Sequence, residues 1–153
     1  MIQMKNKWLL PVLVLILVTA CNKDKFKTEP QVKMRSISPN TVLAGDIIVV
    51  KGDYTDDEGD VDSAFIVYKW YNGPTAVRND TFRYDFNRLN LPPKTREGDF
   101  ELTFEYSTRN HPEIPGIGGV PRDTTAAFGM ILIDKAKHRS VYSESDKIRL
   151  KKP

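Results

Sequence analysis

The sequence predicts an all-β protein, an antiparallel β-sandwich of about seven short strands. Apolar and polar residues alternate with a period of two in successive short runs from Val32 onward. Gly, Pro, Asn and Asp separate these runs, as in the turns of β proteins. Outside the N-terminal apolar run, no window longer than two turns has helical periodicity. An up-and-down barrel is the alternative, which the long, irregular connections disfavour.

The first three strands are expected in the first half of the chain. The first covers Val32 to Ile37. The second, Asp46 to Lys51, contains the continuous apolar run Ile47 to Val50, which indicates a strand buried on both faces. The third, Ser63 to Tyr71, alternates and ends at the strong turn signal Asn72-Gly73-Pro74.

Four further strands are expected after that turn. Thr81 to Phe86 is the weakest, and Gly98-Asp99 opens the most regular one. In that strand the alternation directs Phe100, Leu102, Phe104 and Tyr106 to the core, and Glu101, Thr103, Glu105 and Ser107 to solvent. Ala126 to Ile133 forms the next strand, and Lys147 to Leu150 forms a short edge.

The N-terminal segment has the composition of a secretory signal peptide. Lys5 and Lys7 precede an unbroken apolar run from Trp8 to Val18, and small residues then lead to Cys21, the only cysteine. A charged start, a short apolar run and a small-residue exit are typical of such peptides. The run is too short for a membrane span, which needs roughly 20 apolar residues.

Val18-Thr19-Ala20-Cys21 resembles the lipobox of bacterial lipoproteins. The resemblance implies that residues 1–20 are a cleaved lipoprotein signal peptide and that Cys21 is lipidated. Multiple acyl chains then anchor the protein stably in a membrane. An ordinary signal peptide with a chance cysteine is the alternative. Position 22 is Asn and not the Asp that resembles an inner-membrane retention signal, so the resemblance implies the outer membrane. Lys23-Asp24 resembles a fragment of a lysine-plus-acid surface-export signal but contains only one acid, so the periplasmic and surface faces both stay open.

The composition of the remaining chain limits its domain organisation and its possible partners. Residues 21–31 are polar and aperiodic, which predicts a flexible tether, and residues 32–153 have the length of one domain. Without Lys5 and Lys7, 21 basic side chains stand against 20 acidic ones, so no charge pattern favours nucleic-acid binding. No intramolecular disulfide can form from one cysteine.

Several short motifs resemble those of a known group of proteins. Gly45-Asp46-Ile47 through Lys51-Gly52 resembles the start of a bacterial immunoglobulin-like domain, and Glu97 to Phe104 is similar to a strand of PKD and fibronectin III relatives. Tyr54 to Val61 and Ile133 to Ser140 resemble segments of small Bacteroidetes-type outer-membrane lipoproteins. The resemblance implies an immunoglobulin-like sandwich over residues 32–153, but no activity, because this fold hosts many functions.

An acidic cluster surrounds Gly59. It contains Asp53, Asp56, Asp57, Glu58, Asp60 and Asp62. Hard cations such as calcium take six to eight oxygen ligands, so the cluster is a candidate calcium site, although its spacing does not fit an EF-hand. The alternative is a solvated turn, in which Asp and Gly are present for turn geometry.

A long connection, Thr108 to Arg122, is a second candidate site. Loops of this length within a compact domain are often functional. We expect it to join two adjacent strands at one end of the sandwich and to offer Asn110, His111, Ile114 and Ile117 to a ligand. The alternative is a packed surface excursion.

The pattern of reactive residues does not indicate an enzyme. His111 and His138 lie far apart in the sequence, the only cysteine is expected to carry lipid, and no G-x-S-x-G or phosphate-loop motif is present. We therefore expect a surface recognition module that binds a glycan or a protein through its end loops. The alternative is a structural accessory subunit of an outer-membrane or periplasmic complex.

Overall fold

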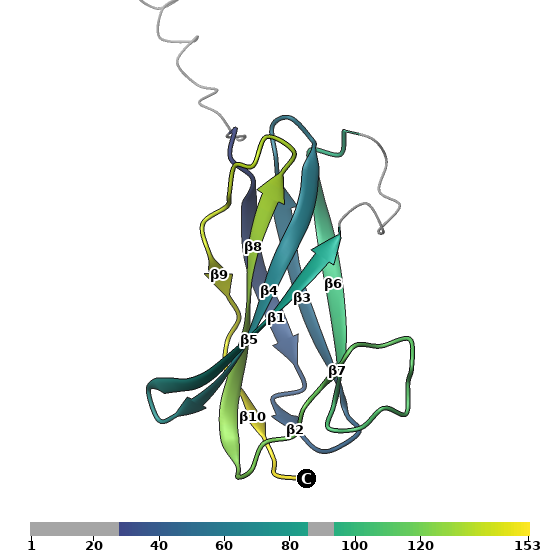
Figure 1. Ribbon diagram of the computed structural model, residues 1–153, viewed down its shortest axis with the longest axis vertical. Helices are drawn as coiled ribbons and strands as arrows, with labels where there is room; N and C mark the ends of the chain where they lie inside the picture. The colour runs from purple at the N-terminus through teal and green to yellow at the C-terminus, as the bar shows by residue number, and fades with distance from the viewer. Residues whose placement is uncertain (1–27, 86–93) are drawn as a thin grey trace, which may run out of the picture.

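The computed structural model describes residues 28–85 and 94–153, which form two β-sheets packed face to face (Figure 1). The predicted all-β class is confirmed. No helix among the described residues is long and apolar enough to span a membrane. The expected signal peptide and Cys21 lie outside the described residues, as does most of the expected tether.

The first sheet has the strand order β1-β3-β6-β7. Its strands are β1 (Gln31–Ser38), β3 (Ile47–Thr55), β6 (Glu97–Tyr106) and β7 (Gly116–Ile117). β1, β3 and β6 are antiparallel neighbours, whereas the short β7 adds to β6 in parallel.

The second sheet has the order β2-β10-β8-β4-β5, with β9 attached to β8. Its strands are β2 (Thr41–Val42), β4 (Val61–Asn72), β5 (Thr75–Asp85), β8 (Thr124–Asp134), β9 (Ser143–Glu144) and β10 (Ile148–Leu150). All pairs are antiparallel except β2 with β10.

All seven predicted runs coincide with strands, but two expectations are wrong in detail. β5 begins at Thr75, six residues before the predicted Thr81, because the Asn72-Gly73-Pro74 turn returns the chain directly onto β4, with Asn72 opposite Thr75. In β3 only one face is fully buried: Ile48 is inaccessible, whereas its neighbours on the other face are half-buried. Phe86, the predicted end of the strand that corresponds to β5, lies outside the described residues.

Aromatic rings join the two sheets in the core. Phe104 of β6 stacks on Phe128 of β8 with ring centroids 4.8 Å apart, and Tyr68 of β4 stacks on the same phenylalanine at 5.1 Å. Because strands of both sheets place these rings on their inward faces, the alternation in the sequence produces one continuous core.

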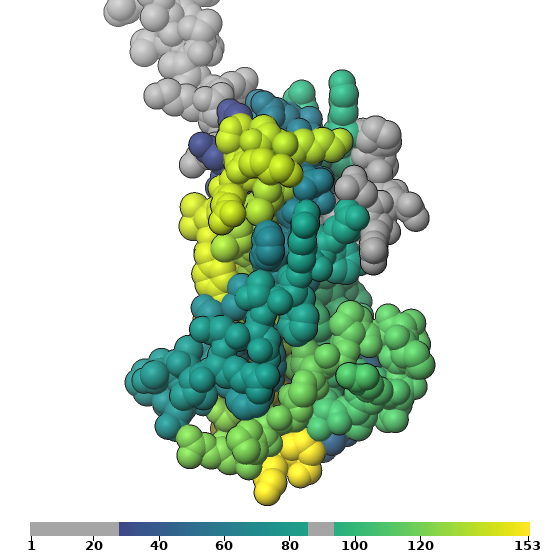
Figure 2. Space-filling model, in the orientation of Figure 1, coloured from purple at the N-terminus to yellow at the C-terminus, as the bar shows by residue number. Residues whose placement is uncertain are grey.

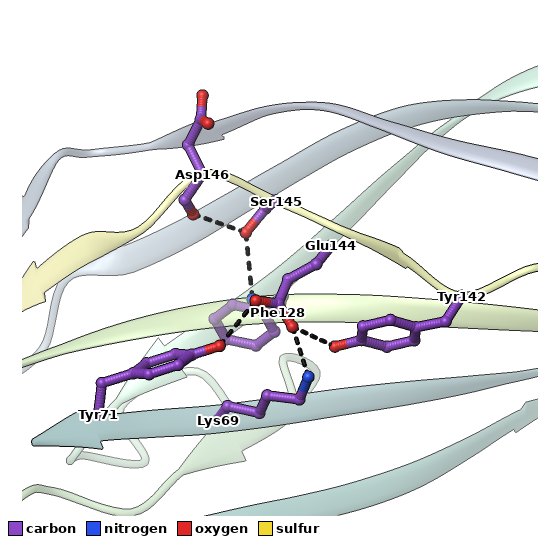
Figure 3. Close-up of polar contacts among 7 residues, drawn as sticks. All are labelled: Lys69, Tyr71, Phe128, Tyr142, Glu144, Ser145 and Asp146. Carbon is purple, nitrogen blue, oxygen red and sulfur yellow. Dashed lines mark hydrogen bonds and ion pairs between the residues drawn. The ribbon is translucent and has the colours of Figure 1, made fainter. Parts of the chain in front are cut away.

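Strand β9 is held on the second sheet by a polar cluster around Glu144 (Figure 3). The Glu144 carboxylate accepts hydrogen bonds from Lys69 Nζ at 2.5 Å, Tyr71 Oη at 2.7 Å and Tyr142 Oη at 2.5 Å. Burial would raise the pKa of Glu144, but these three donors outweigh it and lower the pKa. Gly129 of β8 leaves room for the Tyr142 ring, since an added Cβ would lie 2.1 Å from Tyr142 Oη.

Candidate functional site

The candidate sites lie at opposite ends of the sandwich (Figure 1). The entry end contains the first described residues, the β3–β4 connection and the end of β8. The far end contains the β4–β5 turn, the connection between β6 and β8, and the C-terminus.

At the far end, the buried carboxylate of Glu105 organises the loop that follows β6. It accepts hydrogen bonds from Thr108 Oγ1, from the Asn110 N–H at 2.8 Å and from the His111 N–H at 2.9 Å. The expectation that Glu105 faces solvent is wrong, since the residue is 0% exposed. The loop folds back, and β7 pairs beside Glu105, so the chain covers a face that alternation marks as outer.

The hydrogen bonds to Glu105 keep its carboxylate ionised. Burial would raise the pKa of Glu105, but the donors from Thr108, His111 and Asn110 outweigh burial and lower the pKa to about 2. His111 Nδ1 lies 3.6 Å from the carboxylate, and its side chain is 48% exposed. A fixed negative charge therefore holds an accessible loop in one conformation.

The four predicted binding residues have different environments. Asn110 and His111 are exposed and Ile114 is half-buried, but Ile117 belongs to β7 and to the core, with 4% exposure. Ile117 is thus not an accessible contact, because pairing of β7 with β6 turns its side chain inward. The loop also joins strands of different sheets, not adjacent strands of one sheet.

Tyr106 connects the end of this loop to the C-terminal segment. Its buried hydroxyl donates to the Lys151 carbonyl at 2.8 Å and accepts from the Val120 N–H at 3.1 Å. Two segments that are distant in the sequence are therefore held beside one another at the far end.

An open groove of about 480 Å³ lies at the far end. Its lining consists of Tyr71, Asn72, Gly73, Arg122, Asp123, Thr124, Thr125, Arg149 and Lys151. In Figure 2 the β4–β5 hairpin and the loop after β6 project on either side of the C-terminal segment. No signal in the sequence marks this groove, because its lining comes from three separate segments.

The groove has an excess of positive charge. Asp123 is the only carboxylate in its lining. It pairs with Lys151 Nζ at 2.6 Å and accepts the Lys152 N–H at 2.9 Å. Arg122 and Arg149 are exposed, and neither guanidinium forms an ion pair with a described carboxylate.

At the entry end, the structure separates the six acidic residues of the predicted calcium site. Asp53 forms an ion pair with Arg35 across β1 and β3. Asp57 lies 3.9 Å from Arg96 on an exposed surface, and Asp62 lies 3.4 Å from Lys137. These three carboxylates therefore do not join a common site with the other three.

Asp56 and Asp60 do come together, and Asp134 joins them from β8. One carboxylate oxygen from each residue lies within 4.8 Å of the other two. Burial raises the pKa of Asp56, and the charges of Asp60 and Asp134 raise it further. Glu58 forms a second group with Asp134 and His138. Sequence reasoning missed Asp134, because only the pairing of β4 with β8 brings it beside the loop.

Comparison with known proteins gives no family. No family model and no curated protein matches the chain. Among solved structures, the Bacillus subtilis sporulation control protein Spo0M is similar over 82% of this chain and 50% of its own, with 10% identity and a TM-score of 0.44.

Two other solved structures show a similarly weak likeness. The Pseudomonas fluorescens DNA glycosylase AlkC has 9% identity and a TM-score of 0.48 over 90% of this chain and 33% of its own. The CARDB domain of a Pyrococcus furiosus protein has 11% identity and a TM-score of 0.31 over 82% of this chain and 90% of its own. The chain thus spans half of Spo0M and a third of AlkC, and likenesses this weak assign neither family nor activity.

Proposed function

We propose that this chain is a non-enzymatic lipoprotein of the outer membrane whose immunoglobulin-like sandwich binds an acidic glycan at its far end. The lipobox resemblance of Val18 to Cys21 supports the anchor. A tether of about ten residues reaches roughly 18 Å on average, which would keep the entry end near the membrane. The far end, on the other side of the sandwich, would then point away from the membrane.

The positive groove is the observation that carries the recognition part of the proposal. Guanidinium groups bind carboxylates through two parallel hydrogen bonds, and Arg122 and Arg149 are available for such pairs. Asn72, Thr124 and Thr125 add polar side chains that suit sugar hydroxyls. A polymer of uronic acids offers carboxylates and hydroxyls together, so it matches the groove better than a neutral glycan does.

Binding of the chain from residue 22 to 153 to polygalacturonate and alginate, with dextran as the neutral comparison, tests this proposal. We expect Arg122→Gln and Arg149→Gln each to weaken uronate binding about tenfold, because each removes one charge-assisted pair. Arg83→Gln is the matched control, since Arg83 is exposed on β5 outside the groove. Unchanged binding in the double groove variant, or equal binding of dextran, would contradict the proposal.

The accessory-subunit alternative has one structural feature in its favour. β5 lies at an edge of the second sheet and is largely exposed, so it offers a place for another chain to add a strand. Its charged side chains, including Arg78, Asp80 and Arg83, oppose such pairing. Protease treatment of intact cells separates the two roles: a surface module would be cleaved, whereas a periplasmic subunit would be protected.

A further inference from the structure

One oxygen of a buried carboxylate at the entry end has no hydrogen-bond partner among the described residues. Asp56 is 0% exposed, and its Oδ2 accepts the Asp60 N–H at 2.7 Å. Its Oδ1 is equally buried and accepts no hydrogen bond from the described residues, and Oδ1 of Asp60 is in the same condition. Leaving a buried polar atom without a partner is costly, and more so for a charged one.

A third carboxylate adds to this cost. Asp134 is also 0% exposed, and one of its oxygens lies within 4.8 Å of oxygens of Asp56 and Asp60. His138 contacts Asp134 twice: its N–H donates to Oδ1 at 2.8 Å, and its Nδ1 lies 2.8 Å from Oδ2. No described lysine or arginine forms an ion pair with Asp56 or Asp60. Asp56 and the half-buried Asp60 therefore each have one buried oxygen that accepts no hydrogen bond from the described residues, and no described cation is paired with either carboxylate.

We propose that Asp56, Asp60 and Asp134 bind a single hard divalent cation of the calcium class. The donor atoms are all carboxylate oxygens, which such cations prefer to nitrogen or sulfur. Calcium–oxygen distances are about 2.3–2.6 Å, so one ion can contact oxygens that lie up to about 5 Å apart. The three carboxylate oxygens all lie within 4.8 Å of one another, which fits that span. This set differs from the predicted cluster because it gains Asp134 and does not include Asp53, Asp57, Glu58 or Asp62.

The loop is shaped to present these ligands. Gly59 has a φ of +65°, a conformation that side-chain-bearing residues rarely adopt, and an added Cβ would lie 2.6 Å from the Lys94 backbone. The Asp60 carbonyl accepts the Lys135 N–H at 3.2 Å, which ties the β3–β4 loop to the turn after β8. Exposed Glu58, within 4.8 Å of Asp134, can supply a fourth carboxylate from the solvent side.

The test uses the full chain in detergent after dialysis against a chelator. Calorimetric titration with CaCl₂ should give one binding event per chain, and about 5 mM calcium should raise the melting temperature by about 5 °C. MgCl₂ should have a much smaller effect, because magnesium requires a tighter octahedral site. No calcium heat and no melting shift in the wild type would overturn the proposal and favour a proton shared between Asp56 and Asp60.

Paired variants locate the site. Asp60→Asn should keep the β-sheet circular dichroism of the wild type but lose the calcium-dependent rise. Asp57→Asn in the same loop and Asp62→Asn at the start of β4 are the matched controls and should keep the full rise. A loss in these controls equal to that in Asp60→Asn would overturn the assignment, as would equal stabilisation by magnesium. The result does not depend on glycan binding at the far end, so each proposal can fail without the other.

Discussion

Glu105 ties the far-end loop to β6 through three hydrogen bonds to one carboxylate. We expect Glu105→Gln to lower the melting temperature at pH 7 by several degrees, because an amide NH₂ would then face an N–H donor. The pKa of Glu105 is about 2 in the folded chain, below its ordinary value of 4.5. The carboxylate therefore stabilises the fold fully above pH 4.5, and this contribution is lost as the pH falls to 2.

Melting curves of the wild type and Glu105→Gln from pH 7 to pH 2 measure this effect. The difference between the two melting temperatures should shrink toward zero across the interval from 4.5 to 2. Glu101→Gln on the same strand is the control, since the Glu101–Lys51 pair is more than half exposed and contributes little. A difference between wild type and Glu105→Gln that stays constant with pH would show that the charge of Glu105 is not responsible.

Burial at single positions shows where reasoning from the sequence stops. Period-two alternation correctly directs Phe100 and Phe104 into the core, because it follows from strand geometry alone. The same alternation directs Glu105 outward, since it contains no information about a loop that later covers the strand. Asp134 could not be grouped with Asp56, because strand register, and not sequence spacing, brings them together.

At the scale of elements, β9 depends on its polar contacts because it is only two residues long. Glu144→Gln should destabilise the protein by about 2 kcal/mol, since it weakens three hydrogen bonds to a partly buried charge. Urea denaturation followed by circular dichroism measures the change. Asp80→Asn, which weakens the exposed pair with Arg78, should change stability by less than about 0.5 kcal/mol. Equal losses of stability in the two variants would show that the contacts of Glu144 do not hold β9 on the sheet.

Gly129 provides a second test of the same attachment. Gly129→Ala should destabilise the protein, because its Cβ would occupy the position of the Tyr142 hydroxyl and displace the ring from Glu144. In a Tyr142→Ala background the same substitution should cost much less, since the obstructing ring is gone. A double-mutant cycle measures this coupling. Additive costs would mean that Tyr142 does not set the requirement for glycine.

The strands themselves were predictable to different degrees. Six long strands carry an apolar alternation or run that the sequence displays, and the short β10 carries a weaker one. The first half of β5 was missed because both of its faces are exposed, so hydrophobic periodicity has no reason to be present. β2, β7 and β9 contain two residues each, too few to define a period, and form only because the chain returns to an existing strand.

At the scale of the whole molecule, the two candidate sites lie at opposite ends of the long axis of the sandwich (Figure 1). The carboxylate site lies at the entry end, where the chain arrives from the N-terminal segment, and the positive groove lies at the far end. A cation that joins the β3–β4 loop to the end of β8 would stiffen the end nearest the proposed anchor. The groove would stay free to meet an extended polymer outside the membrane.

The anchor itself gives the last prediction. Cys21→Ala should move the protein from the membrane fraction to the soluble fraction, because the Cys21 thiol is the expected site of lipidation. Stable attachment needs more than one acyl chain, so a chain without this lipid should not stay with the membrane. The sandwich and its groove should be unaffected, so uronate binding in solution should equal that of the wild type. Intact mass of the native protein should show a chain that begins at Cys21 and carries acyl groups. A native chain that begins at Met1 without acyl mass, or a Cys21→Ala variant that stays with the membrane, would contradict the proposed anchor while leaving the groove open to test.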